Sequence, residues 1–595
     1  MMMKRTKIVC TIGPSVNDLD SILALIRAGM DVARVNFSHG DYERHLETIE
    51  ILKEARIISR TPLAIMLDTK GPEIRIGKIK NDVFPVEKGH KLYLVGEDIE
   101  GDDKEIPITP SSVLGDIREG MNVLFHDGYV SSRVLENTGS KVLVEIENKG
   151  ELESRKGVNI PNAILNLPAM TDQDISDIRF GCRQDIDIIA ASFIRSANHV
   201  MAIRELLKEE GKSEIKILAK IENTEGVQNF DNILRVADGI MIARGDMGVE
   251  MPLSQVPRLQ KMMIRKTYLA GKPSVTATQM LESMIHYPRP TRAEVSDVAN
   301  AIYDSTSAVM LSGETAVGRY SIQAVKVMRS IIEEAEKNFD FRDFFRRNSQ
   351  QVYNDVPSSV TLATVKTAYS SNATAIFAFT KSGSTGRLLS RFRPKMPIIA
   401  LTPNQKCYHQ MALNWGVCPI FDSEDYNNVR QAHEALSAAS LDRGLVKYGD
   451  LIVLTAGSPF GIPGTTNSMI VENIGKVLVR GQASYGKRVY GKVMFLFALE
   501  EVNHNEVKDH IIVIPKCNYS YLPFLMKSKG VILENHVEDN ESEQHVLKCA
   551  EELNIPALVR ADGAFTTLHE GQNVTLDPSQ LLVFRGAVEE SESGQ

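Results

Sequence analysis

The sequence predicts an α/β protein built around a closed, parallel (β/α)8 barrel. Eight short apolar runs alternate with segments in which apolar residues recur at helical spacing. The runs are continuously apolar, as expected for strands that are buried on both faces. About 100 residues with a different pattern, short β-rich segments separated by turn-forming residues, interrupt the series once, after the third run. An open, doubly wound sheet remains an alternative, because periodicity does not establish that a sheet closes.

The barrel is expected to use residues 1–70 and 169–345. Its predicted strands cover residues 7–12, 31–37, 63–68, 186–193, 215–221, 239–243, 273–277 and 308–312. Apolar residues at i, i+3 and i+4 are clearest in the segments 18–28, 196–210 and 256–270, which we expect to be helices on the outside of the barrel.

The interruption, residues 71–168, is expected to form a small β domain inserted into a barrel loop. Short β-rich segments at residues 91–95, 121–125 and 141–146 are separated by Gly, Asp and Asn, which favour turns. We expect a β-barrel that acts as a lid, because a domain inserted at this position could close over a site at the barrel mouth.

Two further α/β units are predicted after the barrel. Buried strands at residues 375–380, 397–401 and 450–455 alternate with helical segments and indicate a domain over residues 346–478. A second unit is expected at residues 481–586. The last residues, 587–595, are acidic and rich in Ser, which predicts a disordered tail.

Composition limits the classes of protein that the chain could belong to. A formal net charge of −8 argues against a nucleic-acid partner, which would favour a basic surplus. No apolar run approaches the roughly 20 residues needed to span a bilayer, and the first residues lack the apolar stretch of a signal peptide. The six cysteines are scattered without a CxxC pair, which favours a reducing cytoplasm and gives no sign of zinc.

Charged and small polar residues follow six of the predicted strands. In barrel enzymes the reacting groups lie at these carboxyl ends of the strands. A single charge there is usually part of a solvated loop, but six cases among eight strands indicate a site. The six segments are residues 34–40 (RVNFSHG), 68–71 (DTKG), 220–223 (KIEN), 243–246 (ARGD), 276–279 (TATQ) and 312–315 (SGET).

These residue types suit a divalent metal and an anionic substrate. Glu222 and Asp246 offer hard oxygen ligands for Mg²⁺ or Mn²⁺. Lys220 lies two residues before Glu222, so both side chains point to the same side of a strand. Arg34 can grip a phosphate or carboxylate with two parallel hydrogen bonds, and the amides of Gly245 and Asp246 could bind a carboxylate. Cations and a metal that converge on an anion, without a Ser-His or Cys-His nucleophile, favour direct phosphoryl transfer.

At these positions the sequence resembles the pyruvate kinase family, in order from the N-terminus to about residue 475. The ARGD and MLSGETA motifs are the most specific in combination. The matching segments are residues 7–14 (KIVCTIGP), 34–40 (RVNFSHG), 67–75 (LDTKGPEIR), 220–223 (KIEN), 241–248 (MIARGDMG), 277–284 (ATQMLESM) and 309–316 (VMLSGETA).

The resemblance implies transfer of the phosphoryl group of phosphoenolpyruvate to ADP, giving pyruvate and ATP, in a TIM barrel with a β-barrel lid. It implies that Glu222 and Asp246 hold Mg²⁺ or Mn²⁺ and that Lys220 stabilises the phosphoryl group during transfer. The implied K⁺ ligands are Asn36, Ser38, Asp68 and Thr69, with Glu73 as the determinant of potassium dependence. A cytoplasmic homotetramer is also expected.

The remaining implied roles concern the substrates. Arg34 would bind the phosphate, and Gly245, Asp246 and Thr278 would hold the carboxylate of phosphoenolpyruvate. The candidates for delivering a proton to the enolate are Thr278, Ser312 and Glu314, acting through water. The nucleotide phosphates would face His39, Arg75 and Lys156. In the lid, His126-Asp127 and Asn162 depart from the family pattern, which leaves lid kinetics and nucleotide affinity open; Asp304 begins another departure, before MLSGETA.

A Ser/Thr/Gly turn between a predicted strand and a helix suggests a phosphate cradle. It resembles the family's effector loop, with residues 457–467 (GSPFGIPGTTN) as the facing loop, and implies a sugar-phosphate or nucleotide effector. An ordinary capped turn is the alternative. The residues concerned are Thr380, Lys381, Ser382, Gly383, Ser384 and Thr385.

Residues from 481 onward resemble the mobile phosphohistidine domain of phosphoenolpyruvate-utilising enzymes. The matching segments are residues 530–534 (GVILE), 553–557 (LNIPA) and 571–575 (GQNVT). His545 falls where that family has a phosphorylated His, but Glu541 and Glu543 would oppose a phosphoryl group. A structural or interface role for this domain is the favoured interpretation.

Three other functions are compatible with parts of the sequence. A lyase or aldolase of the phosphoenolpyruvate type could use the same Glu/Asp metal site, but would not need nucleotide. A relay through His545 would require a separate nucleotide domain, and none is evident. A metabolite sensor would not need the complete set of catalytic groups that the sequence contains.

Overall fold

The computed structural model describes residues 4–350, 354–424, 426, 428–457 and 464–588. The expected facing loop at residues 457–467 lies largely outside the described residues, and so does most of the expected tail at residues 587–595. The chain divides into two compact units. One comprises residues 1–366, 376–432 and 455–469, and the other comprises residues 367–375, 433–454 and 470–595.

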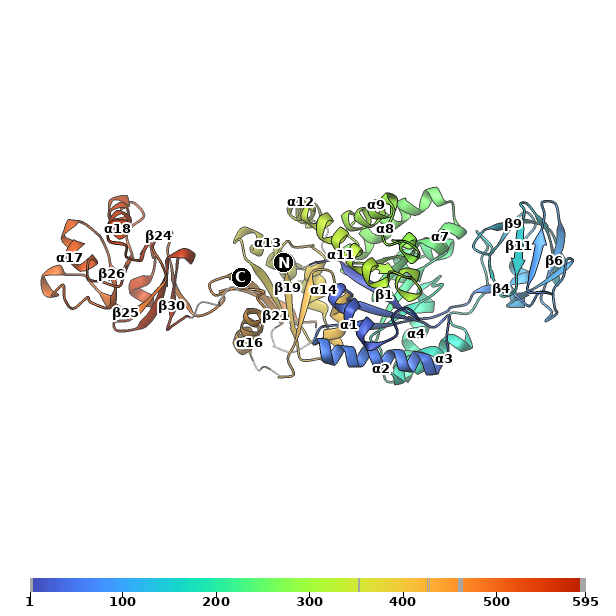
Figure 1. The fold of residues 1–595 in the computed structure, drawn as a ribbon, viewed down its shortest axis with the longest axis horizontal. Coiled ribbons are helices and arrows are strands. Elements are labelled where there is room, and N and C mark those ends of the chain that lie inside the picture. Colours follow the sequence, from blue (N-terminus) through green and yellow to red (C-terminus); the bar gives the residue numbers. More distant parts are fainter. Residues whose placement is uncertain (1–3, 351–353, 425, 427, 458–463, 589–595) are drawn as a thin grey trace. The chain divides into compact units, whose positions relative to one another are not determined.

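All eight predicted barrel strands are present, and they close into a barrel in the order β1-β17-β16-β15-β14-β13-β3-β2. Figure 1 shows β1 of this barrel together with several of its helices, among them α1, α4 and α11. Every neighbouring pair is parallel. The predicted closed barrel is therefore confirmed and the open-sheet alternative is wrong. The strands are β1 (Lys7–Ile12), β2 (Val32–Asn36), β3 (Ala64–Asp68), β13 (Ile188–Ala191), β14 (Lys216–Ile221), β15 (Gly239–Ala243), β16 (Ser274–Ala277) and β17 (Ala308–Leu311).

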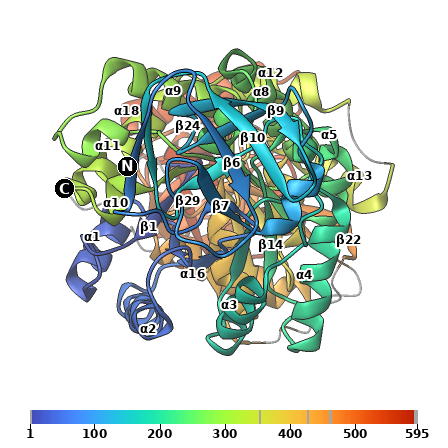
Figure 2. The ribbon, with the colours of Figure 1, turned by 90° about the vertical axis from the view of Figure 1, so that its right-hand side faces the viewer.

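The helices between these strands surround the centre of the view in Figure 2. Local signals fix their ends: Asp18 accepts the Ser21 amide at the start of α1, and Gly29 ends that helix with a φ of 128°. The helices of this part of the chain are α1 (Leu19–Ala28), α2 (Tyr42–Ser59), α3 (Asp172–Arg183), α4 (Ala197–Glu209), α5 (Thr224–Gln228), α6 (Phe230–Val236), α7 (Arg244–Glu250), α8 (Val256–Leu269), α9 (Arg292–Tyr303), α10 (Gly313–Ala316), α11 (Ser321–Lys337) and α12 (Phe341–Asn348).

Alternate strand residues separate two apolar layers. On β14, Ile217 and Ala219 pack in the layer that includes the helices, whereas Leu218 packs inside the barrel with residues such as Met66 and Met241. Side chains alternate between the faces of a strand, so Lys216 and Lys220 lie on the same inner side as Leu218, at opposite ends of β14. Because side chains alternate along the strand, one lysine lies at each end of the barrel interior.

The lid is a second closed barrel, in the order β10-β6-β7-β4-β12-β8-β9, as predicted. Its core contains buried Val, Ile and Leu together with Phe125. The strands are β4 (Ile74–Ile76), β6 (Lys91–Val95), β7 (Glu105–Thr109), β8 (Asn122–Phe125), β9 (Val130–Asn137), β10 (Lys141–Ile146) and β12 (Gly157–Asn159), and β5 (Val83–Val86) pairs separately with β11 (Gly150–Glu153).

A five-stranded sheet follows, in the order β20-β19-β18-β21-β22. The predicted apolar runs correspond to β18, β19 and β21. The strands are β18 (Ala375–Phe379), β19 (Ile398–Thr402), β20 (Val417–Phe421), β21 (Leu451–Gly457) and β22 (Thr466–Asn473), and the helices are α13 (Val356–Ser370), α14 (Ser384–Ser390), α15 (Gln405–Gln410) and α16 (Val429–Asp442).

The last part of the chain forms a mixed eight-stranded sheet in the order β23-β30-β29-β25-β26-β27-β28-β24. Among the described residues, no helix has the length and apolar character needed to cross a membrane. The elements are β23 (Val477–Arg480), β24 (Ala483–Tyr485), β25 (Val489–Phe495), β26 (His510–Ile514), α17 (Leu522–Leu525), β27 (Gly530–Leu533), α18 (Asn540–Leu553), β28 (Ala557–Val559), α19 (Ala564–Thr567), β29 (Asn573–Asp577) and β30 (Leu582–Arg585).

Candidate active site

Lys220 is the centre of a buried charge cluster at the carboxyl ends of the barrel strands. Its Nζ lies 3.0 Å from Asp68 Oδ1, 3.1 Å from Glu222 Oε1 and 2.6 Å from Ser192 Oγ. Burial by itself lowers the pKa of Lys220, but the carboxylates of Asp68 and Glu222 outweigh it and raise that pKa above its ordinary value. The lysine therefore carries a fixed positive charge in a site where only 9% of its surface is exposed.

Arg34, on β2, adds a second cation to this cluster. Its Nε forms an ion pair with Asp68 Oδ2 at 2.5 Å, and its Nη1 donates to Thr11 Oγ1 at 2.9 Å. Burial raises the pKa of the Asp68 carboxyl, but Arg34 and Lys220 together hold it below its ordinary value. Asp68 is thus an ionised hub that orients both cations.

The four residues expected to bind a monovalent cation lie at the ends of β2 and β3. Asp68 and Thr69 are buried, and Asn36 and Ser38 are half-buried, with the Ser38 amide donating to Asn36 Oδ1. Asn36 lies opposite Asp68 in the register of β2 and β3. All four side chains carry oxygen atoms, the type of ligand that hard cations prefer. Glu73 instead forms an ion pair with Arg75, which lies on β4, the first strand of the lid.

Glu222, which follows β14, is buried, and Asp246, on α7 just after β15, is half-buried. Burial, followed by the charge of Asp246, raises the pKa of the Glu222 carboxyl although Lys220 opposes this effect. Burial also raises the pKa of the Asp246 carboxyl. Two such carboxylates fit a divalent cation that neutralises them and keeps other positions for water and substrate oxygens. Within the described part of the chain, no cluster of three or more His, Cys, Asp or Glu residues could hold a metal.

The end of β16 fixes a turn beside Asp246. Thr278 has a φ of 65°, rare for a β-branched residue, and its Oγ1 accepts the Gly245 amide at 2.8 Å. Arg244 holds this turn in place because its side chain donates to the carbonyl oxygens of Ala277 and Thr278. The Gly245 amide, which the sequence analysis expects to bind a carboxylate, therefore donates to the Thr278 hydroxyl in this structure.

The two remaining proton-transfer candidates interact with each other at the end of β17. The Glu314 carboxylate accepts the backbone amides of Ser312 and Leu281 at 2.7 and 3.0 Å. Burial raises the pKa of Glu314 above its ordinary value despite these hydrogen bonds.

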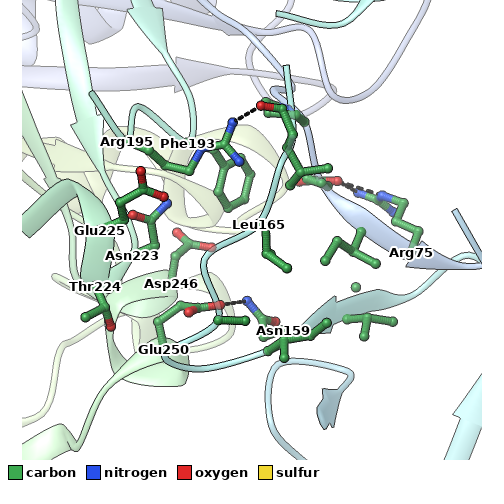
Figure 3. Close-up of a pocket in the computed structure, with 18 of the residues that line it drawn as sticks. Arg75, Asn159, Leu165, Phe193, Arg195, Asn223, Thr224, Glu225, Asp246 and Glu250 are labelled. Atoms are coloured by element: carbon green, nitrogen blue, oxygen red, sulfur yellow. Dashed lines mark hydrogen bonds and ion pairs between the residues drawn. The ribbon is translucent and has the colours of Figure 1, made fainter. Parts of the chain in front are cut away.

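A cavity of about 250 Å³ lies beside this cluster and is lined by both the barrel and the lid (Figure 3). Asp246 and Glu250 extend from α7 on one side, and Glu250 accepts a hydrogen bond from the lid residue Asn159 at 2.8 Å. Arg75 and Lys156, two of the three residues expected to face nucleotide phosphates, line the same cavity. The third, His39, is exposed and is not among the lining residues.

Sequence reasoning missed Ser192 and Phe193, which follow β13. Ser192 Oγ contacts Lys220 and lies 2.6 Å from the Thr69 carbonyl oxygen, and the Phe193 amide donates to Glu222 Oε2 at 2.5 Å. Phe193 has a φ of 53°, so a tight turn aims its amide at the carboxylate. Their position in the sequence could have identified them. The two residues end the fourth apolar run, and the other site residues likewise lie at the ends of apolar runs.

Two predicted features are not part of this cluster. The Ser382-Gly383-Ser384 turn connects β18 to α14, with Gly383 at a φ of 79° and the Ser382 hydroxyl donating to Ser384 Oγ at 3.1 Å. Thr380 and Thr385 are buried and Lys381 is half-buried. His545 lies inside α18, where the edge of the Tyr519 ring faces it with 4.6 Å between the ring centroids.

The closed barrel, the fixed cations at its mouth and the adjacent carboxylate pair define a phosphotransferase of the barrel class. The chain belongs to the pyruvate kinase family. The family model described as "Pyruvate kinase, barrel domain" matches residues 3–325, which is more than half of the chain. The model "Pyruvate kinase, alpha/beta domain" matches residues 358–472, and "PEP-utilising enzyme, mobile domain" matches residues 507–580. Enzymes of this family are generally metal-dependent.

Individual relatives agree with this assignment. The chain is 41% identical to a pyruvate kinase of Geobacillus stearothermophilus over 587 residues, covering 98% of this chain and 99% of the relative. A pyruvate kinase of Staphylococcus aureus is 39% identical over 586 residues, with the same coverage. Among solved structures, a pyruvate kinase from Cryptosporidium parvum matches with a TM-score of 0.76 and 37% identity, covering 79% of this chain and 96% of that chain.

Proposed function

We propose that the protein transfers the phosphoryl group of phosphoenolpyruvate to ADP, giving pyruvate and ATP. The bond between phosphorus and the enol oxygen breaks, and a bond to the terminal phosphate oxygen of ADP forms. The single observation that carries this proposal is the Lys220 ammonium, which is buried among Asp68, Ser192 and Glu222 and remains charged. A preorganised cation of this kind stabilises negative charge on a group in transfer.

The proposed cofactors are Mg²⁺ or Mn²⁺, and K⁺. Glu222 and Asp246 would hold the divalent ion, which when bound would neutralise charge on the phosphoryl oxygens. Support comes from the raised pKa values of these two carboxyls, which a bound cation would lower. The proposed K⁺ ligands are Asn36, Ser38, Asp68 and Thr69, with Glu73 as the determinant of potassium dependence.

The chain's own residues would position phosphoenolpyruvate. Arg34 would bind its phosphate, and the amides of Gly245 and Asp246 with the Thr278 hydroxyl would bind its carboxylate. This role requires Thr278 Oγ1 to release the Gly245 amide, a hydrogen bond of 2.8 Å that a carboxylate oxygen would replace.

After transfer, the enolate of pyruvate must take a proton at carbon. We assign this delivery to a water chain that involves Thr278, Ser312 and Glu314. The raised pKa of Glu314 supports the assignment, because a carboxyl group that retains its proton closer to neutral pH is a better proton donor.

For the nucleotide, we propose that Arg75 and Lys156 contact the ADP phosphates from the lid side, with His39 contributing from the barrel. The two lid cations pair with Glu73 and Glu153 at half-buried positions that remain accessible to water. Such pairs are weak in water and are easily exchanged for a phosphate. The lid, residues 71–168, would then exclude water during transfer.

We further assign residues 1–70 and 169–345 to the catalytic barrel and residues 346–478 to a domain that binds a sugar-phosphate or nucleotide effector at Thr380–Thr385. Residues 481–586 would have a structural or interface role, without phosphotransfer through His545. The working form would be a cytoplasmic homotetramer.

The decisive experiment is a coupled assay for pyruvate, with phosphoenolpyruvate, ADP, Mg²⁺ and K⁺, on the wild type and Lys220→Met in parallel. We expect turnover that requires ADP and is lost in the variant. Pyruvate release without ADP would indicate a lyase, and binding of phosphoenolpyruvate without turnover would indicate a sensor; either result would overturn the proposed reaction.

A further inference from the structure

Ser192, the first residue after β13, places a buried hydroxyl group against the ammonium of Lys220. Ser192 is 4% exposed, and its Oγ accepts a hydrogen bond from Lys220 Nζ at 2.6 Å. It lies at the carboxyl end of the barrel strands, where barrel enzymes hold their reacting groups. The proposed reaction gives this hydroxyl no role of its own, although it is closer to Nζ than the carboxylates of Asp68 and Glu222 are.

Two hydrogen bonds to Thr69 hold Ser192 in one orientation. The Ser192 amide donates to Thr69 Oγ1 at 3.1 Å, and the Ser192 hydroxyl donates to the Thr69 carbonyl oxygen at 2.6 Å. Asp68 Oδ1 is a more distant acceptor for the same hydroxyl, at 3.3 Å. A hydroxyl group has one hydrogen, so the bond to Thr69 leaves the lone pairs of Ser192 Oγ for Lys220. Ser192 is therefore a fixed acceptor for the lysine.

Two of the three N–H bonds of Lys220 are directed by such fixed acceptors. Nζ donates to Asp68 Oδ1 at 3.0 Å as well as to Ser192 Oγ, and Asp68 is itself held by an ion pair with Arg34. Because the bonds of an ammonium are arranged tetrahedrally, fixing two N–H bonds also fixes the direction of the third. The lysine is thus held with one N–H bond in a set direction.

The neutral character of Ser192 suits this task, because Lys220 already has the carboxylates of Asp68 and Glu222 within 3.1 Å. A third carboxylate in place of the hydroxyl would surround the ammonium with excess negative charge and oppose an incoming phosphoryl group. An apolar residue would leave the position of the ammonium to the two carboxylates, which both attract it. A hydroxyl group orients the ammonium without cancelling its charge.

We propose that Ser192 is a positioning residue for Lys220: with Asp68 it fixes two N–H bonds of the ammonium, so that the third points at the phosphoryl group in transfer. The identity of that group rests on the proposed function, whereas the contact between Ser192 and Lys220 does not. A residue that orients a charge for the transition state affects kcat more than it affects substrate binding.

The first test is steady-state kinetics of Ser192→Ala with phosphoenolpyruvate and ADP. We expect kcat to fall by about 10–100-fold, the range for loss of a group that orients a catalytic residue, while the KM for ADP and the affinity for Mn²⁺ stay unchanged. Ser274→Ala is the matched control. Ser274 is fully buried at the start of β16, at the other end of the barrel strands, and its Oγ accepts the Ser307 amide at 3.3 Å. Its variant should keep the wild-type kcat.

The double variant Ser192→Ala/Lys220→Met separates positioning from a general structural effect. If Ser192 acts through Lys220, the double variant has the same kcat as Lys220→Met, because no ammonium remains to be oriented. A structural defect would instead multiply the two losses. Should Ser192→Ala fold poorly, Ser192→Cys should lower kcat in the same direction, since a thiol is a weaker acceptor than a hydroxyl group.

The second test needs no substrate. Full-length protein is labelled with acetic anhydride, and mass spectrometry compares Lys220 with Lys216 at the other end of the same strand. We expect the ratio of Lys220 to Lys216 labelling to rise by about twofold or more in Ser192→Ala, because loss of a hydrogen bond to the charged form lowers the pKa of the ammonium. The ratio should not change in Ser274→Ala.

A wild-type kcat in Ser192→Ala, multiplied losses in the double variant, or an unchanged labelling ratio would each overturn the role of Ser192. A wild-type protein without ADP-dependent turnover would overturn the proposed reaction, and the labelling ratio would then decide whether Ser192 positions Lys220.

Discussion

At the scale of single residues, the site depends on a few buried charged side chains that each interact with more than one partner. Asp68 is 1% exposed and contacts both Arg34 and Lys220. Glu222 is 2% exposed, pairs with Lys220 and accepts the backbone amide of Phe193. Removing one member of such a set leaves another buried charge unpaired, which costs more than the pair contributed. Substitutions here must therefore be judged by catalysis and binding together with stability.

We expect Lys220→Met to lower kcat by about 10²–10³-fold or more, the range for loss of a group that stabilises transition-state charge. Methionine keeps most of the length of the side chain but removes the charge. Steady-state kinetics should show a fall in kcat with little change in the Kd for phosphoenolpyruvate. A variant that retains near-normal kcat would contradict the role assigned to Lys220.

For the metal site, Asp246→Asn should raise the Mg²⁺ concentration at half-saturation by roughly 10–100-fold, the range for a perturbed metal site. The amide keeps an oxygen ligand but loses the negative charge. Direct titration with Mn²⁺, followed by its magnetic resonance signal, measures this without relying on turnover. Asp297→Asn is a suitable control because Asp297 pairs with Arg244 and is not a proposed ligand. Equal Mn²⁺ affinity in wild type and Asp246→Asn would exclude Asp246 as a ligand.

His409, on α15, gives a prediction for the dependence of stability on pH. It is 6% exposed, its Nδ1 accepts the Leu63 amide at 3.3 Å, and burial together with Arg56 and Lys406 lowers its pKa to about 3. The folded protein therefore keeps His409 neutral at pH values where the unfolded chain, with a pKa near 6.5, binds a proton. Stability is unaffected above about pH 6.5 and falls as the pH decreases below it, by about 2 kcal/mol at pH 5.

Thermal unfolding at pH 7.5 and pH 5 should therefore show a smaller loss of Tm in His409→Asn, whose amide oxygen can still accept a hydrogen bond, than in the wild type. The exposed residue His286 provides the matched control, and His286→Asn should behave as the wild type does. The same loss of Tm in wild type and His409→Asn would show that this buried histidine does not contribute.

At the scale of elements, the start of α3 connects both ends of the lid to the barrel. Asp174 is 2% exposed; its Oδ1 accepts the Gly71 amide, where the chain enters the lid, at 2.9 Å. Its Oδ2 accepts the Thr171 amide and hydroxyl, where the chain has returned, at 2.8 and 2.7 Å. A capping box thus also fixes the two connections on which the lid would move.

Asp174→Ala leaves these amides without a partner and should lower the free energy of unfolding by about 1–3 kcal/mol. It should also increase hydrogen exchange at Gly71 and Thr171 and raise the KM for ADP more than that for phosphoenolpyruvate. Asp172→Ala, in the same turn at an exposed position, should change none of these. Unchanged exchange at the two connections in Asp174→Ala would mean that the lid is held by other contacts.

At the scale of the whole molecule, the C-terminal sheet lies in a different compact unit from the barrel site. The first turn of its helix α18 contains Glu541 and Glu543, and Glu543 forms an ion pair with Arg560. His545 therefore follows an acidic first turn, whereas a phosphoryl group would require cationic or amide partners. This local electrostatic pattern favours a domain without phosphotransfer.

We expect His545→Asn to keep the wild-type kcat and KM values, in contrast to Lys220→Met. Incubation with phosphoenolpyruvate labelled in its phosphate should leave no acid-labile label on the protein. A labelled histidine in the wild type that is absent from His545→Asn would instead establish a relay through the C-terminal domain.

The sequence by itself determined the series of parallel strands and helices, because an apolar run buried on both faces followed by a helical period is a local signal. It also determined that Lys220 and Glu222 share one side of β14, since strand side chains alternate with a period of two. The polar residues at the strand ends could also be located from the sequence, because they directly follow the apolar runs. Eight such strands closed into the predicted barrel.

Only the tertiary structure decided which of these charges meet. Asp68 and Lys220 are 152 residues apart in the chain, and Ser192 joins them from a third strand. Pairing between distant segments depends on closure of the barrel and on packing of its helices, and local sequence patterns do not encode such distances.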